Sequence, residues 1–94
     1  MFTVEIYTPE KRVFQGEAKY LIAPGKKGWF GILTNHAPLL SSLCPGRICV
    51  DMMDNTRKTL KVPGGFLEVD NNRVIILADA IDHDDAAVPP APHK

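Results

Sequence analysis

The sequence lacks most of the features that mark secreted, membrane-spanning or zinc-binding proteins. Only two of its 94 residues are cysteines, which is too few for a disulfide framework or a four-cysteine zinc site. We therefore expect reduced thiols in a cytosolic protein. No apolar run approaches the roughly 20 residues that cross a bilayer as a helix. Residues 1–5 also lack the basic and apolar segments of a signal peptide.

The charges give no excess of either sign. Eleven lysine and arginine residues are balanced by eleven aspartate and glutamate residues. A nucleic-acid-binding domain usually carries a basic excess or a basic stripe, and the nearest feature here is the pair Lys26 and Lys27. The sequence therefore predicts no nucleic-acid partner.

A sustained helical period is also absent, and the chain alternates between apolar and polar residues instead. Phe2, Val4 and Ile6 alternate with other residues, which is the pattern of a half-buried strand. Similar short segments recur with turn residues about every 8–12 positions, as is typical of a β-sandwich or a barrel. A chain of 94 residues is long enough for one such domain with a single core.

The pattern predicts strands separated by Gly, Pro, Asn and Asp turns. A strand from residue 13 is expected to be interrupted near Gly16, residues 24–28 are expected to form a loop that breaks the ladder, and residues 54–55 and 70–72 suit hairpin turns. The segment 73–78 is apolar on both faces, as expected of a central strand. The other expected strands lie at residues 2–7, 18–22, 48–53, 56–62 and 66–69. Apolar residues also occur at 29–33 and at Leu39, Leu40 and Leu43.

The character of the chain changes after Ile81. Residues 82–85 read Asp-His-Asp-Asp, and residues 89–94 contain three prolines. This segment has too little apolar surface to offset the entropy of ordering. We therefore expect one β-domain over residues 1–81 and a charged, proline-rich, disordered tail over residues 82–94.

No set of residues forms a complete catalytic or metal-binding motif. The acidic run at residues 82–85 is interpreted as a solvated charge run, because metal ligands need a rigid frame. Cys44 and Cys49 have no further ligands at zinc spacing and are interpreted as packing residues. The loop 25–28 lacks the Gly-Lys-Ser/Thr end and the helix of a phosphate-binding loop. The sequence therefore predicts no catalytic residue, metal or cofactor.

Two local features are compatible with either a structural or a functional role. The corner at residues 35–40, Asn-His-Ala-Pro-Leu-Leu, is either a turn whose imidazole bonds the backbone or part of a contact surface. Trp29 and Phe30 lie just upstream, and aromatic residues on loops often anchor interfaces. The glycine pair 64–65 allows positive φ or close backbone approach, and a fold-determining bend is the preferred interpretation.

Four segments together resemble the N-terminal β-sandwich of the epsilon subunit of the F-type rotary ATP synthase. They read Gly-Trp-Phe-Gly-Ile-Leu-Thr-Asn-His-Ala-Pro-Leu-Leu at 28–40, Pro-Gly at 45–46, Val-Pro-Gly-Gly-Phe-Leu-Glu-Val at 62–69 and Asn-Arg-Val-Ile-Ile-Leu-Ala-Asp at 72–79. The opening strand and residues 13–18 agree as well, so the similarity runs from residue 2 to residue 81. The resemblance implies a flattened antiparallel β-sandwich of about ten short strands.

The resemblance also implies a role and partners. Members of the family lie in the central stalk, bind the gamma subunit and rest on the ring of membrane c subunits. They help to couple proton flow through the ring to ATP synthesis on the catalytic alpha and beta subunits, which they serve indirectly. We therefore expect a non-catalytic rotor subunit on the cytoplasmic side of the inner (plasma) membrane. It is expected to contact the membrane only through the complex.

The resemblance also implies two contact surfaces, one at an end of the sandwich for the c ring and one on a sheet face for gamma. In many members an acid occupies the position of Trp29, so Lys26, Lys27 and Trp29 would contact the ring here by other means than that acid's salt bridge. The residues expected at the end facing the c ring are Gly28, Trp29, Phe30, Asn35 and His36. The residues expected to face gamma are Tyr7, Pro9 and Leu40.

Typical members continue into a two-helix hairpin that can inhibit ATP hydrolysis. In this sequence the corresponding position, residues 82–87, leads into a proline-rich end. If the chain is complete, we expect hairpin-mediated inhibition to be absent.

Two other classes of function are compatible with the residues alone. One is a free-standing β module that binds a small ligand on Trp29 and Phe30 as a stacking platform. The other is a small enzyme that uses Cys44 or His36. Neither is favoured, because no convergent set of polar residues accompanies those side chains.

Overall fold

Nine β-strands make up the part of the chain that the computed structural model describes, residues 1–83. No helix in this range is long and apolar enough to cross a membrane. The prediction of an all-β domain with about ten strands is confirmed. The strands are β1 (Phe2–Tyr7), β2 (Arg12–Gly25), β3 (Gly28–Ile32), β4 (Leu39–Leu43), β5 (Gly46–Met52), β6 (Arg57–Val62), β7 (Gly65–Asp70), β8 (Arg73–Leu77) and β9 (Asp82–His83).

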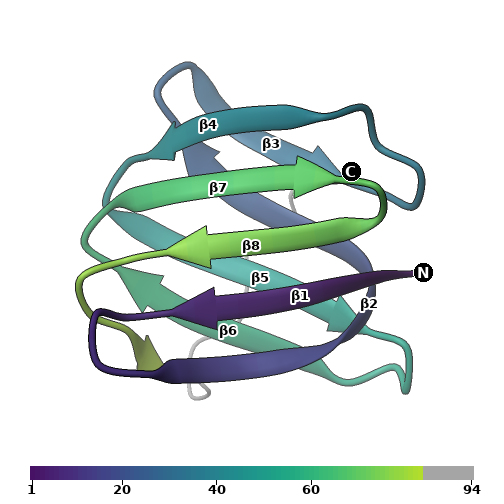
Figure 1. The fold of residues 1–94 in the computed structure, drawn as a ribbon, viewed down its shortest axis with the longest axis horizontal. Helices are drawn as coiled ribbons and strands as arrows, with labels where there is room; N and C mark the ends of the chain where they lie inside the picture. The colour runs from purple at the N-terminus through teal and green to yellow at the C-terminus, as the bar shows by residue number, and fades with distance from the viewer. Residues whose placement is uncertain (84–94) are drawn as a thin grey trace.

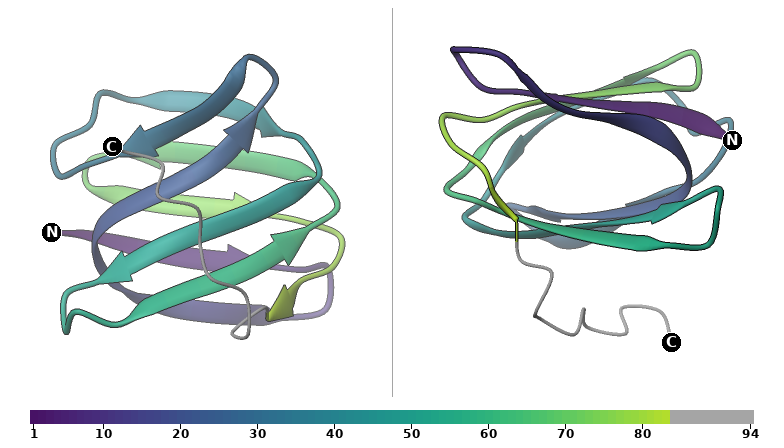
Figure 2. Two further views of the ribbon diagram at one scale, coloured as in Figure 1. Left: turned by 180° about the vertical axis from the view of Figure 1, so that it is seen from behind. Right: turned by 90° about the horizontal axis from the view of Figure 1, so that it is seen from below.

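The strands form two layers that face each other across one core (Figures 1 and 2). The front layer contains, in order, β4, β7, β8, β1 and the first half of β2, and the back layer contains β3, the second half of β2, β5, β6 and β9. The 14 residues of β2 allow it to belong to both layers. Its first half pairs with β1, and its second half pairs with β3 and β5. The predicted sandwich is confirmed.

One pairing departs from the antiparallel arrangement that we expected throughout. β1 runs parallel to β8, with Thr3 opposite Arg73 and Tyr7 opposite Leu77. Parallel neighbours need a long crossover connection, and the strands between β1 and β8 provide it. The sheet is therefore mixed, with one parallel pair among the strands of the described range.

Alternate residues of each strand point into the core. Val4 and Ile6 of β1, like Val74 and Ile76 of β8, have no exposed surface. Burying an apolar side chain of this size contributes about 1.5–3 kcal/mol, so the core is the main source of stability. Its other members include Phe2, Ala18, Leu21, Ala23, Ile32, Leu43, Ile48, Val50, Leu60, Val62, Leu67 and Val69.

Gly16 does not interrupt β2, and this expectation was wrong. It lies opposite Val4 in the ladder between β1 and β2. A Cβ at this position would come within 2.4 Å of the Met52 side chain. The glycine therefore provides space for packing inside a continuous strand and does not mark a break.

The segment 24–28 forms a tight hairpin, whereas the sequence predicted a loop that ends the ladder. β2 and β3 remain paired until Gly25 faces Gly28, so only Lys26 and Lys27 form the turn. Gly28 has a φ of 117°, a conformation that strains residues with a Cβ. Because Gly28 takes this unusual φ, the chain reverses direction without breaking the ladder between β2 and β3.

Both predicted Asn turns are confirmed, one as a two-residue turn and the other as a three-residue loop. Between β7 and β8, Asn71 and Asn72 have φ values of 55° and 62°, as in the two-residue turns that match strand twist. Between β5 and β6, Asn55 has a φ of 70°. The N–H of Met52 there donates to the carbonyl of Thr56, so the loop contains three residues.

β8 is central within its sheet but is not covered on both faces. It lies between β1 and β7, and Val74 and Ile76 face the core. Leu77 is 52% exposed and Ile75 is partly exposed. The expectation that both apolar faces of this segment would be buried was wrong, because no further layer of residues 1–83 covers the outer face.

The sheet continues two residues beyond the expected domain boundary at Ile81. Asp82 and His83 form β9, which pairs with Lys61 and Leu60 of β6. The rest of the expected tail lies outside the described residues. The same is true of Asp84 and Asp85 in the acidic run that was considered as a metal site.

Candidate protein-docking surfaces

The outer surface of the front layer, which we call the front face, carries a row of apolar side chains. Because Leu67 of β7 points into the core, its neighbours Phe66 and Glu68 point outward. The ladder places Phe66 opposite Leu77 and Leu77 opposite Tyr7. Three neighbouring strands therefore present apolar or aromatic side chains in one row.

Leu40 extends this apolar surface onto β4. It is 75% exposed, compared with 56% for Phe66 and 52% for Leu77. Leu40 faces Glu68 across the ladder, one step along the face from Phe66. Neighbouring exposed apolar side chains indicate an interaction surface, whereas isolated ones do not. Two of the residues predicted on the gamma side, Tyr7 and Leu40, thus share a face with Phe66 and Leu77, two residues for which the sequence predicted no surface role.

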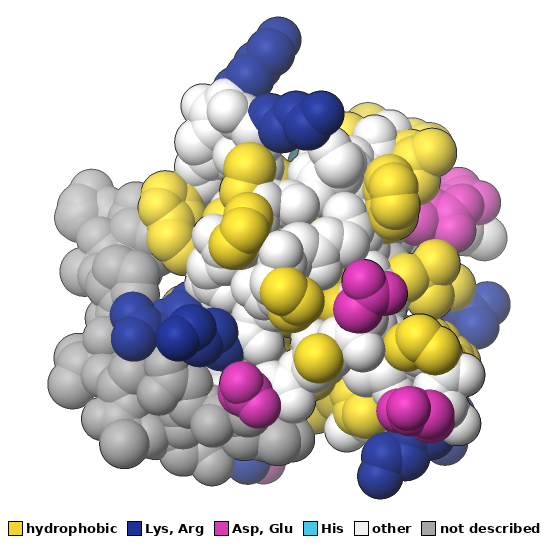
Figure 3. Space-filling view, turned by 90° about the vertical axis from the view of Figure 1, so that its left-hand side faces the viewer, with side chains coloured by type: hydrophobic (Ala, Val, Ile, Leu, Met, Phe, Trp, Pro, Cys, Tyr) yellow, Lys and Arg dark blue, Asp and Glu magenta, His cyan; other side chains and the backbone are white. Residues whose placement is uncertain are grey.

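A groove of about 580 Å³ lies at the end of the front face where β1, β4 and β8 terminate. Tyr7, Pro9, Phe66 and Leu77 are among the residues that line it. Pro9, the third residue predicted on the gamma side, therefore lies beside Tyr7. Figure 3 looks onto this end of the sandwich, where hydrophobic side chains are spread over the surface.

Gly64 and Gly65 form part of the groove wall and confirm the predicted bend. Their φ values are 132° and 147°, which residues with a Cβ rarely adopt. A Cβ on Gly65 would lie 2.1 Å from the carbonyl oxygen of Leu77. The pair therefore serves both purposes that the sequence allowed, since it turns the chain and lets β7 approach the end of β8.

A polar cluster borders the apolar row on β1. The Tyr7 hydroxyl donates to Glu5 Oε1 over 2.5 Å, and Arg73 Nη2 donates to the same oxygen over 3.3 Å. The bond from Tyr7, and next the bond from Arg73, hold the pKa of Glu5 below its usual value. The bond to Glu5 also raises the pKa of Tyr7. The cluster fixes the Tyr7 ring at the edge of the groove.

The five residues predicted to face the c ring do not gather at one end of the sandwich. Gly28, Trp29 and Phe30 begin β3, whereas Asn35 and His36 lie in the loop after it. Four residue steps of a strand cover roughly 13 Å, and Figure 1 shows the β2–β3 turn and the β3–β4 loop at opposite ends of β3. The expectation of a single cluster was wrong because β3 separates the two groups.

Trp29 and Phe30 have different surroundings. Trp29 is 51% exposed and lines a hollow of about 270 Å³ with Gly46, Arg47 and Lys61. Phe30 is partly buried and packs against the core. The two rings therefore do not form the common stacking platform that the ligand-binding alternative requires.

Hydrogen bonds fix the β3–β4 loop. The N–H of Asn35 donates to Asn72 Oδ1 over 2.7 Å, and Asn72 Nδ2 donates to Asn35 Oδ1 over 2.9 Å. His36 Nδ1 lies 2.7 Å from the carbonyl oxygen of Ala37. The backbone-bonded imidazole that the sequence allowed is therefore present, and it bonds no nucleophile or carboxylate in the described range.

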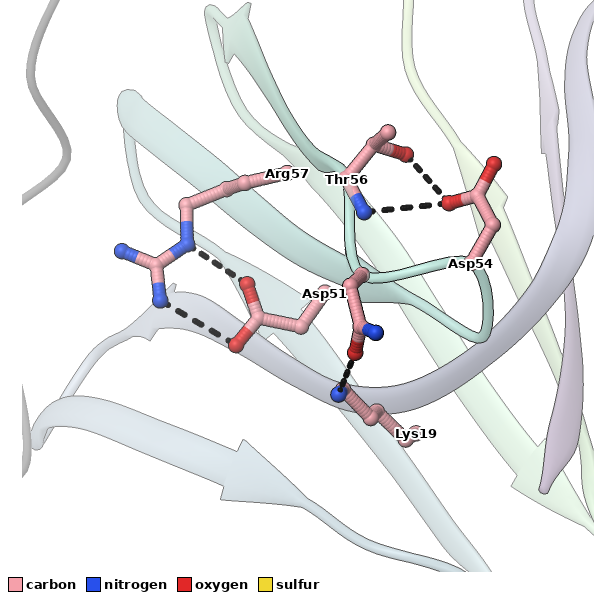
Figure 4. Close-up of polar contacts among 6 residues, drawn as sticks. Lys19, Asp51, Asp54, Thr56 and Arg57 are labelled. Carbon is pink, nitrogen blue, oxygen red and sulfur yellow. Dashed lines mark hydrogen bonds and ion pairs between the residues drawn. The ribbon is translucent and has the colours of Figure 1, made fainter.

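The polar contacts around the β5–β6 turn act on the turn itself (Figure 4). Arg57 Nε and Nη2 donate to the two carboxylate oxygens of Asp51 over 2.5 and 3.1 Å. Asp54 accepts from the N–H and the hydroxyl of Thr56 over 3.0 and 2.6 Å. Surface pairs of this type contribute roughly 0–1 kcal/mol each. We interpret them as local supports of the loop.

The two cysteines do not form a reactive pair. Cys49 is buried, and this burial raises the pKa of its thiol, which lowers the fraction of nucleophilic thiolate. Cys44 is half-buried, and both thiols are free. Within residues 1–83 no group of three His, Cys, Asp or Glu side chains could hold a metal ion.

The fold is a small β-sandwich whose front face exposes an apolar row. Residues 1–84 match the family described as the beta-sandwich domain of the ATP synthase delta/epsilon chain. The chain belongs to this family.

Relatives with known names agree with this assignment. The ATP synthase epsilon chain of Chlorobaculum tepidum is 41% identical over 80 residues, which are 85% of this chain and 91% of the relative. That of Chlorobium limicola is 39% identical with the same coverage. That of Dichelobacter nodosus is 42% identical over 83% of this chain but only 54% of its own length. The chain therefore spans nearly the whole of some relatives and about half of others.

Two solved structures share the fold. One is the Euglena gracilis mitochondrial ATP synthase (OSCP/F1/c-ring), in which a chain superimposes with a TM-score of 0.82 at 18% identity, over 87% of this chain and 52% of that chain. The other is the central stalk and c-ring of the Tetrahymena thermophila mitochondrial ATP synthase, with a TM-score of 0.73 at 18% identity, over 86% and 65% of the two chains. At this identity the likeness concerns the fold.

Proposed function

We propose that this chain is a central-stalk (rotor) subunit of a proton-translocating F-type ATP synthase. In this role it binds the gamma subunit and the c ring, helps to couple ion flow to ATP synthesis, and carries out no catalytic step itself. It lies peripherally on the cytoplasmic side of the membrane as part of the complex. Family membership supports the proposal, and the single observation that carries it is the exposed apolar row of the front face.

The front face is the proposed gamma-binding surface. Leu40, Phe66 and Leu77 are each more than half exposed, so a partner can remove a large apolar area from water. Burial of such area drives most protein association. The rigid Tyr7 ring and Pro9 border the adjacent groove, which gives the surface a fixed shape for recognition.

The end of the sandwich that carries Trp29 is the proposed ring-facing surface. The tip of the β2–β3 hairpin projects from the body of the molecule, and Trp29 lies directly beside it (Figure 1). Asn35 and His36, at the far end of β3, would contact the ring only if it extends along that strand. A Trp29→Ala variant should weaken ring assembly by about 2 kcal/mol or more if Trp29 anchors the contact.

Co-purification with the gamma subunit of the same organism tests the proposal. The full chain and gamma should form a stable one-to-one complex in size-exclusion chromatography with mass detection. Phe66→Lys and Leu77→Lys should each weaken that complex, because they place a charge in the apolar row. Met53→Lys is the matched control, since Met53 is 47% exposed but lies in the β5–β6 turn. A folded chain that does not bind gamma would contradict the proposal.

A further inference from the structure

Carboxylates border the apolar row of the front face on both sides. Glu68 lies one step along the face, between Leu40 of β4 and Ile75 of β8 in the ladder. On the other side of the row, Asp79 lines the groove. Both carboxylates belong to exposed residues, and Figure 3 shows acidic side chains among the hydrophobic ones at the groove end. The apolar row is therefore flanked by negative charge.

Three carboxylates of this face share one arginine. Arg73 donates to Glu5, whose side chain is only 9% exposed, over 3.3 Å. Asp70 faces Arg73 across the ladder, and the charge of Glu68 also acts on Arg73. Arg12 of β2 is a further basic residue next to β1. Because Asp79 adds a fourth carboxylate, the acids of the front face still outnumber these two bases.

A hollow of about 320 Å³ lies beside the apolar row and has room for a side chain of a partner. Glu68, Asp70, Arg73 and Ile75 are among the residues that line it. Lysine and arginine bury their aliphatic stems on apolar surface and keep the charged group near polar atoms. The hollow offers both, since Ile75 lies between carboxylates.

We propose that the segment of the gamma subunit that covers the front face is amphipathic and basic. Its apolar stripe covers Phe66 and Leu77, and lysine or arginine side chains flank the stripe, toward Glu68 and Asp70 on one side and toward Asp79 on the other. This inference rests on the proposed function, because it names the chemistry of the partner at the same surface. The apolar contact supplies most of the affinity, whereas the flanking charges steer association and fix the orientation.

Association kinetics with gamma separate the two contributions. Glu68→Gln and Asp79→Asn keep the shape of each side chain but remove its charge. Each should lower the association rate constant about threefold or more at low salt and change the dissociation rate constant little. Leu77→Ala should instead raise the dissociation rate constant. Glu17→Gln, at an exposed acid on the edge strand beyond β1, is the matched control and should associate normally.

The salt dependence of association is the second measurement. Raising the salt from about 0.02 to 0.5 M should slow association of the unaltered chain, because it screens the charges. The double variant Glu68→Gln/Asp79→Asn should respond less. A complex whose association depends neither on salt nor on these variants would overturn the inference and leave the proposed function standing. Faster association of the variants would indicate an acidic partner segment and would also overturn the inference.

Two peptides test the same chemistry without gamma. A leucine–lysine peptide with the pattern of an amphipathic helix should bind the full chain, whereas its leucine–glutamate counterpart should not. Leu77→Lys should weaken this binding about tenfold or more, and Met53→Lys, outside the front face, should not. Equal binding of both peptides, or of neither, would contradict the inference. If gamma does not bind, the proposed function fails, and binding of the leucine–lysine peptide alone still assigns the surface to a basic amphipathic partner.

Discussion

The amide groups of Asn35 and Asn72 bind each other and join two loops that are far apart in the sequence. Asn72 Oδ1 accepts from the N–H of Asn35, and Asn72 Nδ2 donates to Asn35 Oδ1. The carbonyl of Asn72 also accepts from the N–H of Thr3 over 3.0 Å. One residue of the β7–β8 turn therefore connects the β3–β4 loop with the first strand.

The first prediction concerns this pair. Asn72→Gly keeps the positive φ but removes two hydrogen bonds, each worth about 0.5–1.5 kcal/mol, so we expect unfolding in urea to show a loss of about 1–2 kcal/mol. Asn72→Ala should lose roughly 1 kcal/mol more, because alanine is strained at a φ of 62°. Asn71→Gly, at the neighbouring turn position, is the control and should change stability little. Equal effects of the two glycine variants would contradict the role of the bonded pair.

The second prediction compares two glycines with positive φ. Gly65→Ala should destabilise the domain by more than about 3 kcal/mol, because strain in φ adds to a clash with the Leu77 carbonyl 2.1 Å from the new Cβ. Gly28→Ala should cost only about 1–2 kcal/mol, since no atom lies within 4 Å of its Cβ position. Thermal unfolding of both variants checks the order. Similar melting temperatures of the two variants would show that backbone strain alone, and not the clash with Leu77, determines the loss of stability.

The third prediction is a pH dependence that arises from Glu5. The bonds from Tyr7 and Arg73 lower its folded-state pKa below the ordinary 4.5, so they stabilise the fold fully above pH 4.5. As the pH falls below that value toward the folded pKa, the unfolded chain binds the proton first and this stabilisation is lost. Tyr7→Phe removes the hydrogen bond that lowers the pKa of Glu5 most. The stability of this variant should therefore decrease less as the pH falls.

Urea midpoints between pH 7 and pH 3 measure this effect. Asp54 also has a lowered pKa, because it accepts bonds from Thr56, so the Tyr7→Phe variant should keep part of the acid sensitivity. Thr56→Val should reduce that separate part. If the urea midpoint of Tyr7→Phe decreases toward low pH as steeply as that of the unaltered chain, the assignment of this effect to Glu5 is wrong.

The fourth prediction tests the two faces of β8. Val74→Asp and Ile76→Asp place a carboxylate in a core where both positions are fully buried, so each should unfold the domain. Leu77→Asp, on the exposed face of the same strand, should remain folded and affect only partner binding. Circular dichroism of the three variants distinguishes these outcomes. A folded Val74→Asp variant would refute the assignment of the inner face.

From the sequence, the side chains of a strand that face the core are predicted well, but which strands lie side by side is predicted poorly. Alternation from Phe2 to Ile6 identifies which side chains enter the core, because a strand has a period of two residues. The row from Tyr7 to Leu77 and Phe66 depends instead on β1 lying beside β8 and β8 beside β7. The first of these pairings joins distant parts of the chain, and no local pattern encodes it.

Local rules also fail where tertiary packing decides. Gly16 reads as a break, but its missing Cβ makes room for Met52. Residues 24–28 read as a loop, but Gly28 takes the positive φ and the ladder continues. The family resemblance placed the five predicted ring-side residues at one end of the sandwich, whereas β3 separates Gly28, Trp29 and Phe30 from Asn35 and His36.

The parallel pairing of β1 with β8 determines when this domain can become complete during synthesis. Proteins emerge from the ribosome with the N-terminus first, so β1 and β2 can pair early as a hairpin. The other edge of β1 has its partner only after Leu77 has been made, near the end of the described chain. Contacts over such separations form slowly. The nascent chain therefore keeps one edge of β1, with its unpaired backbone groups, without its partner for most of its elongation.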